Sequence, residues 1–171
     1  MLLTKQQKFL LAALEKLGCA ELRQLAALLQ KAFAFSSLDD AMRVTNACVQ
    51  QMRSGGLLQI SEDMIVHIND YVNTEITNAI AVMLELSAAQ PPEEFRTVDR
   101  HILLRFSLGE PDFKRFAIVS GSAPPPEREL RQEETIIVLI PTGAKPELSY
   151  ARPIIFAIRQ EDGTHRFFAR K

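Results

Sequence analysis

Hydrophobic positions in the first third of the chain recur at helical spacing. Thr4 and Gln7 predict a capping box at the start of a first helix, and Gly18 is the kind of residue that commonly ends one. A second helix is predicted from about Ala20. The stretch 30–35 either extends this second helix or forms a loop. The apolar positions that define the two helices are Phe9, Leu10, Ala13, Leu14, Leu17, Leu22, Leu25, Ala26, Leu28 and Leu29.

A third helix is predicted from a capping box at Ser37 and Asp40 to about Arg53. The pattern separates its two faces, because residues three and four apart lie on the same side of a helix. One face is expected to pack inward, and its residues are Leu38, Met42, Thr45, Val49 and Met52. The opposite face is expected to meet solvent or a partner, and its residues are Arg43, Asn46, Gln50 and Arg53.

Two short strands are predicted after this helix. Gly55-Gly56 ends the helix, and the runs 57–61 and 64–68 are joined by Glu62-Asp63. The two runs therefore predict a β-hairpin.

A change of period marks the second half of the chain. A helix is expected from Thr74 to about Ala89, and Pro91-Pro92 ends it. Apolar residues then alternate over 102–108, and a turn at 109–112 leads into a returning strand over 113–119. This pattern predicts a second hairpin. A short helix is expected over 127–132, and the uniformly apolar run 135–140 predicts a strand that is central in its sheet.

The last two strands, 154–160 and 164–170, are predicted to pair across a two-residue turn at Asp162-Gly163. This register would place Ile158 opposite Phe167 and Phe156 opposite Ala169. It would also place Arg159 opposite Arg166, which is a like-charge pair that destabilises a sheet unless a carboxylate or an anion lies over it.

The order of elements in residues 1–70, which is three helices, Gly-Gly and a hairpin, resembles the winged helix-turn-helix superfamily, and 22–26 (LRQLA) resembles its usual second helix. The resemblance implies an α+β protein with a winged-helix domain over 1–70. Residues 71–171 would form a linker helix and a small C-terminal α/β domain with a largely antiparallel sheet. The apolar strands 136–140 and 153–158, followed by Asp162-Gly163, are similar to a family found in Firmicute conjugative elements, which implies a mobile genetic element as the setting.

Composition and charge favour a globular protein without a global attraction for polyanions. The hydrophobic content is 47%, and 20 basic residues stand against 21 acidic ones. Cys19 and Cys48 lie in helical patterns, and we expect them to be buried thiols in a reducing cytoplasm. No apolar run is long enough to span a membrane, so no membrane partner is predicted. Residues 1–8 lack the basic-then-apolar pattern of an export signal, so a cytoplasmic location is expected.

No catalytic or metal-binding residue is predicted. Pro111-Asp112 resembles the position of the first metal-binding carboxylate in a nuclease. Such a site also needs a second acid and a lysine spaced Glu-x-Lys on the next strand, and no lysine follows Glu133 or Glu134 at that spacing. The stretch 142–145 lacks the other residues of a phosphate loop. His67, His101 and His165 are scattered, and Asp99 with His101 is expected to form at most a polar pair. No cofactor is expected.

Two functions remain open. The first is a non-enzymatic regulatory or accessory protein associated with double-stranded DNA, in which Arg43, Asn46, Gln50 and Arg53 enter the major groove. The second is a protein-interaction or dimerisation module that does not bind DNA. Residues 1–70 contain seven Lys or Arg and seven Asp or Glu, so the basic excess that supports DNA affinity is missing.

Overall fold

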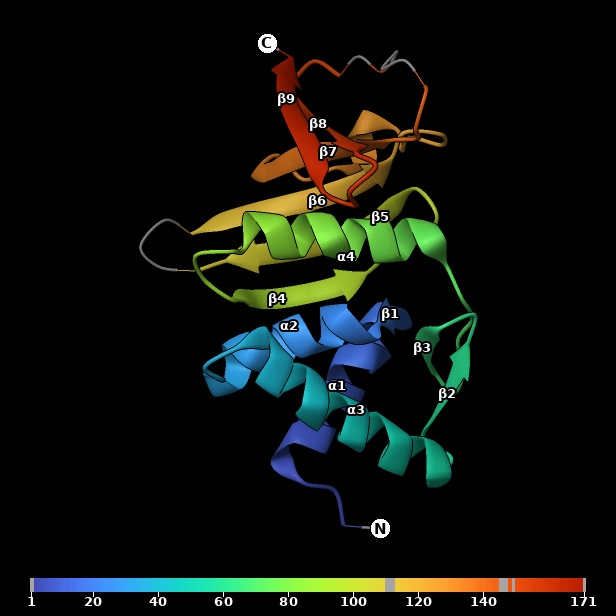
Figure 1. Ribbon diagram of the computed structural model, residues 1–171. Coiled ribbons are helices and arrows are strands. Elements are labelled where there is room, and N and C mark those ends of the chain that lie inside the picture. The colour runs from blue at the N-terminus through green and yellow to red at the C-terminus, as the bar shows by residue number, and fades with distance from the viewer. Residues whose placement is uncertain (1, 110–112, 145–147, 149, 171) are drawn as a thin grey trace.

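A computed structural model describes residues 2–109, 113–144, 148 and 150–170 of the chain. The fold is α+β, with helices and two separate sheets. Helices α1, α2 and α3 gather at one end of the molecule, and the larger sheet forms the other end with helix α4 lying across it (Figure 1). The N-terminal elements are α1 (Lys5–Leu17), β1 (Cys19–Glu21), α2 (Leu22–Phe33), α3 (Leu38–Ser54), β2 (Leu58–Ser61) and β3 (Met64–His67).

The predicted helix boundaries around α1 and α3 follow from local capping. The Thr4 side chain accepts a hydrogen bond from the backbone N–H of Gln7, and Gln7 returns a bond to the backbone of Thr4. Gly18 ends α1 with a φ of 76°, and its N–H donates to the Leu14 carbonyl. At α3, the Ser37 side chain accepts from the backbone N–H of Asp40. These signals are local, so the sequence alone is sufficient to find them.

The second helix begins later than predicted, because a strand precedes it. Residues 19–21 form β1, which pairs with β3 in a sheet of order β1-β3-β2. Glu21 then takes the N-cap position, and its backbone N–H donates to the Gln24 side chain. For residues 30–35 the sequence left a longer second helix and a loop as alternatives. The structure shows that α2 continues through Phe33 and that Ala34 then adopts a left-handed conformation with a φ of 51°.

The C-terminal part contains α4 (Thr74–Leu86), β4 (Pro92–Thr97), β5 (Ile102–Leu108), β6 (Lys114–Ser120), the short 3-10 helix η1 (Glu127–Glu129), β7 (Glu134–Ile140), β8 (Ile154–Arg159) and β9 (His165–Arg170). The six strands form one sheet in their chain order. The pairs β4-β5, β5-β6 and β8-β9 are antiparallel, whereas β6-β7 and β7-β8 are parallel. The predicted antiparallel pairing of 102–108 with 113–119 and the central place of 135–140 are therefore confirmed, whereas residues 110–112 of the predicted turn lie outside the described residues.

Several boundaries in this part differ from the prediction, and α4 ends at Leu86 instead of at about Ala89. Asn73, one residue before Thr74, caps α4 by accepting from the backbone N–H groups of Glu75 and Ile76. The helix predicted over 127–132 is a single 3-10 turn. Pro92 was predicted to break the structure, but it begins β4, which is an edge strand. Proline is tolerated in an edge strand because one side of such a strand forms no hydrogen bonds with another strand.

The predicted register of the last hairpin is wrong by one residue. Phe167 lies opposite Ala157, and Arg166 lies opposite Ile158. The loop has three residues, because Gln160 pairs with Thr164 and only Gly163 has a positive φ. Asp162 accepts hydrogen bonds from the backbone N–H and the hydroxyl of Thr164 instead of taking the first left-handed position.

This register removes the predicted arginine pair. Arg159 lies opposite His165 instead of Arg166, and its Nη1 atom donates to the Asn78 side chain at 2.6 Å.

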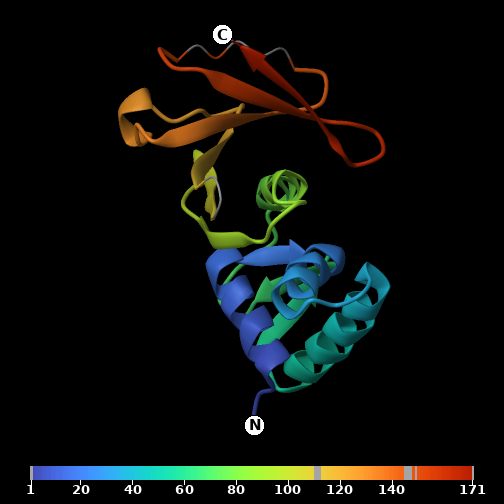
Figure 2. The ribbon, with the colours of Figure 1, turned by 90° about the vertical axis from the view of Figure 1, so that its left-hand side faces the viewer.

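Apolar residues on the two faces of the large sheet belong to different core clusters. Helix α4 covers one face of the sheet and also contacts α2 and β1, as Figure 2 shows from the side. The first cluster runs continuously from α1, α2 and α3 through Ile80 and Met83 of α4 to Leu104 and Phe106 of β5. The second cluster lies on the other face around Val138. The predicted division at residue 70 stays a prediction.

Candidate nucleic-acid interface

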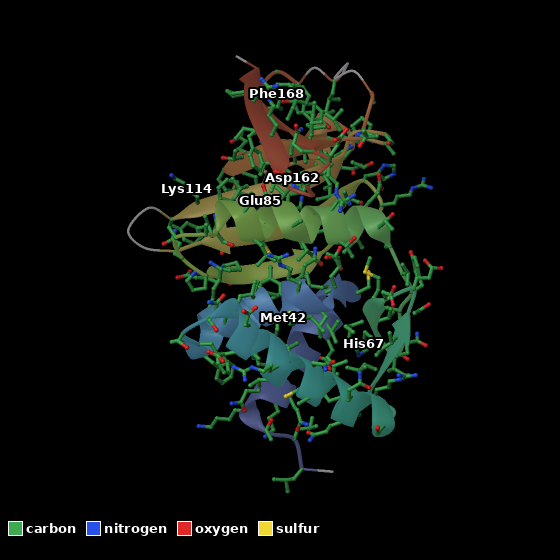
Figure 3. All side chains as sticks on the ribbon, viewed as in Figure 1. Met42, His67, Glu85, Lys114, Asp162 and Phe168 are labelled. Carbon is green, nitrogen blue, oxygen red and sulfur yellow. The ribbon has the colours of Figure 1, made fainter. Side chains whose placement is uncertain are left out.

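The four residues predicted to contact DNA lie together on one exposed face of α3. Arg43, Asn46, Gln50 and Arg53 are all exposed, and they span about 15 Å at the helical rise per residue. The opposite face packs against α1, α2 and β2, and its buried residues are Ala41, Thr45, Cys48, Val49 and Met52. Met42, labelled on α3 in Figure 3, lies half-buried at the boundary between the two faces. The predicted amphipathic pattern of α3 is thus confirmed.

Three of these four side chains are free to meet a ligand. Among the described residues, the side chains of Asn46, Gln50 and Arg53 form no hydrogen bond or ion pair. Amide and guanidinium groups are the side chains that most often bind base edges and phosphates. The exposed face of α3 therefore offers both donors and acceptors along its length.

Arg43 is already engaged by a carboxylate of its own helix. Its Nη2 atom contacts Asp40 Oδ1, and the same Asp40 carboxylate accepts from the hydroxyls of Ser36 and Ser37. These bonds, with that of Ser37 the strongest, lower the pKa of Asp40 below its usual value of 3.8. Asp40 is therefore ionised at neutral pH and holds Arg43 close to the N-terminus of α3. A ligand phosphate would have to compete with this carboxylate.

The β2–β3 hairpin ends in a second acidic pair. Glu62 and Asp63 both have positive φ angles, 51° and 64°, which is the geometry of the tight turns that favour a right-handed strand twist. Both side chains are exposed. The base of the hairpin is held by a 3.2 Å contact between His67 Nδ1 and the Asp70 carboxylate; Figure 3 labels His67.

The two cysteines are buried and free, as predicted, but Cys19 lies in strand β1 instead of in a helix. Burial raises the pKa of both thiols above the usual value of 9.0. The Cys19 thiol donates to the Asn73 carbonyl at 3.6 Å, and its sulfur accepts from the Asn73 N–H at 3.4 Å. Cys19 therefore helps to join β1 to the start of α4, and its protonated state does not favour nucleophilic chemistry.

The side chains of Asp99 and His101 contact backbone groups instead of each other. The Asp99 carboxylate accepts from the N–H groups of His101 and Ile102 at 2.7 and 2.8 Å. The His101 ring contacts the Ala123 carbonyl at 2.8 Å through Nδ1. The polar pair that the sequence allowed is therefore not formed, and three contacts with backbone groups hold the start of β5.

Within the part of the chain that the structure describes, the other candidate groups lie apart from one another. Over the described ranges, no group of three or more His, Cys, Asp or Glu could hold a metal ion. The Ser120 hydroxyl is buried and donates to the Glu75 carboxylate at 3.1 Å. Asp112 and Lys145, which were weighed as nuclease and phosphate-loop residues, lie outside the described residues. Of the helices that the structure describes, none is long and apolar enough to cross a membrane.

Two contacts between polar side chains that join distant elements were not predicted. His165, whose side chain is 1% exposed, joins β9 to Glu85 of α4 at 2.8 Å, and Figure 3 labels Glu85 on that helix. Glu134 on β7 pairs with Arg105 on β5. The sequence offered one signal for these contacts, which is the presence of charged or titratable residues within the predicted strands. Their partners could not be found without the order of the strands in the sheet.

Comparison of the chain with protein-family models, with curated proteins and with solved structures found no match in any of the three.

Proposed function

We propose that residues 1–70 form a winged helix-turn-helix domain and that this domain associates with double-stranded DNA in a non-enzymatic regulatory or accessory protein. The element order α1-β1-α2-α3-β2-β3 and the sheet order β1-β3-β2 support the proposal. A winged helix uses its third helix for recognition and its last hairpin as the wing, and these elements correspond here to α3 and β2–β3.

The exposed face of α3 carries the proposal. Its side chains supply the chemistry that the major groove reads, because asparagine and glutamine bind adenine edges and arginine binds guanine edges or phosphates. Asn46 and Gln50 lie between Arg43 and Arg53 along the helix. We therefore assign phosphate contacts to the two arginines and base or sugar contacts to the two amides.

Charge limits the strength of this association. Residues 1–70 hold as many acidic as basic side chains, and Asp39, Asp40, Glu62 and Asp63 lie where a winged helix approaches phosphates. Since phosphate contacts supply most nonspecific affinity and only two arginines are assigned to them, we expect binding in the micromolar range with a shallow salt slope.

The first experiment measures the affinity of the full chain for a mixed-sequence duplex by fluorescence anisotropy at several salt concentrations. Arg43→Ala and Arg53→Ala should each weaken binding and flatten the salt slope by about one ion. Arg128→Ala is the matched control, because Arg128 is an exposed arginine of η1 that lies in the other half of the chain. Equal affinities for all four proteins would refute binding through α3.

A second experiment removes the competing carboxylates. Asp39→Asn with Asp40→Asn should tighten DNA binding, because the Arg43 guanidinium then loses its intramolecular partner. Ser37 still caps the helix in this variant. Unchanged or weaker binding would contradict the assignment of Arg43 to a phosphate.

Protein interaction or dimerisation is the second candidate, and the pairing of Arg43 with Asp40 favours it. This contact reduces the free positive charge of α3, and the acidic turn at Glu62 and Asp63 suits a protein surface better than a phosphate backbone. Sedimentation of the full chain at several concentrations tests it. A dimer that survives where DNA binding is absent would select this second function.

A further inference from the structure

A cavity of about 450 Å³ lies beside strands β4, β5 and β6 and is bordered by Lys16 at the end of α1 and Arg131 before β7. Of the described residues that line it, five are cationic and two, Glu94 and Glu134, are carboxylates. The cationic residues are Lys16, Arg96, Arg105, Arg115 and Arg131. The cavity therefore has an excess of positive charge in a chain whose net charge is −1.

The strand register gathers three of these arginines on one face of the sheet. Arg105 lies opposite Ala117, which belongs to the core cluster on the face away from α4. Arg96 lies opposite Arg105, and Arg115 is two residues before Ala117. Since alternate residues of a strand point to the same face, all three side chains belong to the face that α4 does not cover.

Arg96 and Arg105 form a like-charge pair directly across two antiparallel strands, which destabilises a sheet. The protein neutralises only one of them. Arg105 Nε lies 2.8 Å from Glu134 Oε1, and the Arg105 Nη2 atom donates to the Glu129 carbonyl at 3.0 Å. Arg96 forms no ion pair or hydrogen bond within the part of the chain that the structure describes.

The remaining cations are held loosely. Arg131 Nε is 3.9 Å from Glu134, which already pairs with Arg105. Arg115 Nη1 is 3.4 Å from Glu133 with both side chains about half exposed. Lys16 Nζ lies over the Phe95 ring, 5.5 Å from its centre. An anion in the cavity could therefore be approached by several cations without breaking a buried ion pair.

We infer that this cavity binds a phosphate group, with Arg96 and Arg115 as its direct contacts and Arg105 as a cation held in place by Glu134. Arginine suits this role because its planar guanidinium can donate two parallel hydrogen bonds to a phosphate. The volume lies in the range of small-molecule sites. The phosphate can belong to a free phosphorylated molecule or to a DNA backbone, and only the DNA source rests on the proposed function.

The test uses inorganic pyrophosphate and the full chain at constant ionic strength, with calorimetry and thermal unfolding as readouts. Pyrophosphate should raise the Tm, and Arg96→Gln and Arg115→Gln should each weaken its binding by about tenfold, as expected for the loss of a charge-assisted contact. Arg23→Gln is the matched control, since Arg23 is an exposed arginine on α2 outside the cavity. It should bind pyrophosphate as the parent does.

Stability of the unliganded variant separates binding from folding. Arg96→Gln removes one member of the like-charge pair, so its Tm without pyrophosphate should equal or exceed that of the parent. A lower Tm would contradict the unneutralised repulsion on which the inference depends.

DNA binding distinguishes the two sources of phosphate. If pyrophosphate binds and Arg96→Gln weakens it, the site takes free phosphorylated molecules, whether or not the parent binds DNA. If pyrophosphate does not bind but Arg96→Gln weakens duplex binding, the site contacts the DNA backbone.

Two outcomes overturn this inference. If Arg43→Ala weakens duplex binding while Arg96→Gln changes the binding of neither pyrophosphate nor the duplex, the proposed function stands and this inference is overturned. If Arg96→Gln changes neither ligand and Arg43→Ala has no effect, both are overturned.

Discussion

Glu134 and Arg105 form an ion pair across the sheet, with 2.8 Å between Oε1 and Nε, although β6 lies between their strands. The Glu134 side chain is 2% exposed and that of Arg105 is 15% exposed. Glu134 also accepts from the Arg131 backbone N–H at 3.2 Å. The carboxylate therefore joins β5, β7 and the turn before β7.

Removing one partner of this pair should cost more than removing both. Glu134→Ala leaves the Arg105 guanidinium without its carboxylate, and we expect a loss of about 3 kcal/mol in the free energy of unfolding. Arg105→Met with Glu134→Leu removes both charges at similar volume and should lose much less. Urea unfolding of both variants is the measurement. An equal or larger loss in the double variant would show that the ion pair itself is the stabilising element.

The two phenylalanines of the last hairpin should differ in their contribution to stability. Phe156 is 1% exposed, whereas Phe168, its neighbour across the strands, is 36% exposed, and the ring centres are 5.4 Å apart. Figure 3 labels Phe168 on β9. Phe156→Ala should cost about 4 kcal/mol, because it opens a cavity in the second core cluster. Phe168→Ala should cost about 1 kcal/mol. Similar losses in urea unfolding would contradict this register.

Gly121 should not tolerate a side chain. A Cβ atom at this position would lie 2.2 Å from the Leu139 carbonyl oxygen, which also accepts the Gly121 N–H at 2.8 Å. Gly121→Ala must therefore move β7 away or break this hydrogen bond, and we expect a loss of about 3 kcal/mol. Ser122→Ala, at the exposed next residue, is the control and should change stability by less than about 0.5 kcal/mol. If Gly121→Ala matches this control in thermal unfolding, the close approach is not present in solution.

Asp99 should make stability depend on acid pH. The hydrogen bond from the Ile102 N–H, followed by that from His101, holds the pKa of Asp99 below its usual value of 3.8. A carboxyl group with a lowered folded-state pKa stabilises the fold above the unfolded-state pKa, and this contribution disappears as the pH falls through the folded-state pKa. Asp99→Ala should therefore lose about 1 kcal/mol at pH 7, as for a lost helix cap.

The difference between Asp99→Ala and the parent should shrink as the pH falls from about 3.8, the usual pKa, through the lower pKa of Asp99 in the folded protein. Urea unfolding at pH 7, 4 and 3 measures it. Asp39→Ala is a useful comparison, because Asp39 is an exposed aspartate of α3 for which no hydrogen bond is found among the described side chains. A difference that stays constant with pH would assign the Asp99 effect to packing instead of charge.

Several elements could be predicted because their causes are local. The Thr4 capping box, Gly18 and the Ser37 cap act within a few residues, so they define α1 and the start of α3 from the sequence. The amphipathic period placed Arg43, Asn46, Gln50 and Arg53 on one exposed face. The apolar run 135–140 was correctly expected at the centre of a sheet, because a strand buried on both faces has no polar alternation.

Other elements depend on partners that are distant in the sequence. The strand β1 has only three residues and exists through its pairing with β3, about 45 residues later. The edge strand β4 begins with a proline and carries charged side chains, so neither its propensity nor its pattern predicts a strand. The Asp162-Gly163 dipeptide allowed two loop lengths, and the longer one was selected together with the pairing of Phe156 and Phe168.

The sequence by itself determined the first and third helices with their N-terminal caps, the exposed polar face of α3 and the strands of strongest apolar pattern, because these follow from interactions within one turn or one strand. Only the tertiary structure decided that Arg96 faces Arg105 and that Glu134 neutralises one of them. Such pairs depend on register and strand order, and these are fixed by the packing of the whole sheet and core instead of by any single segment.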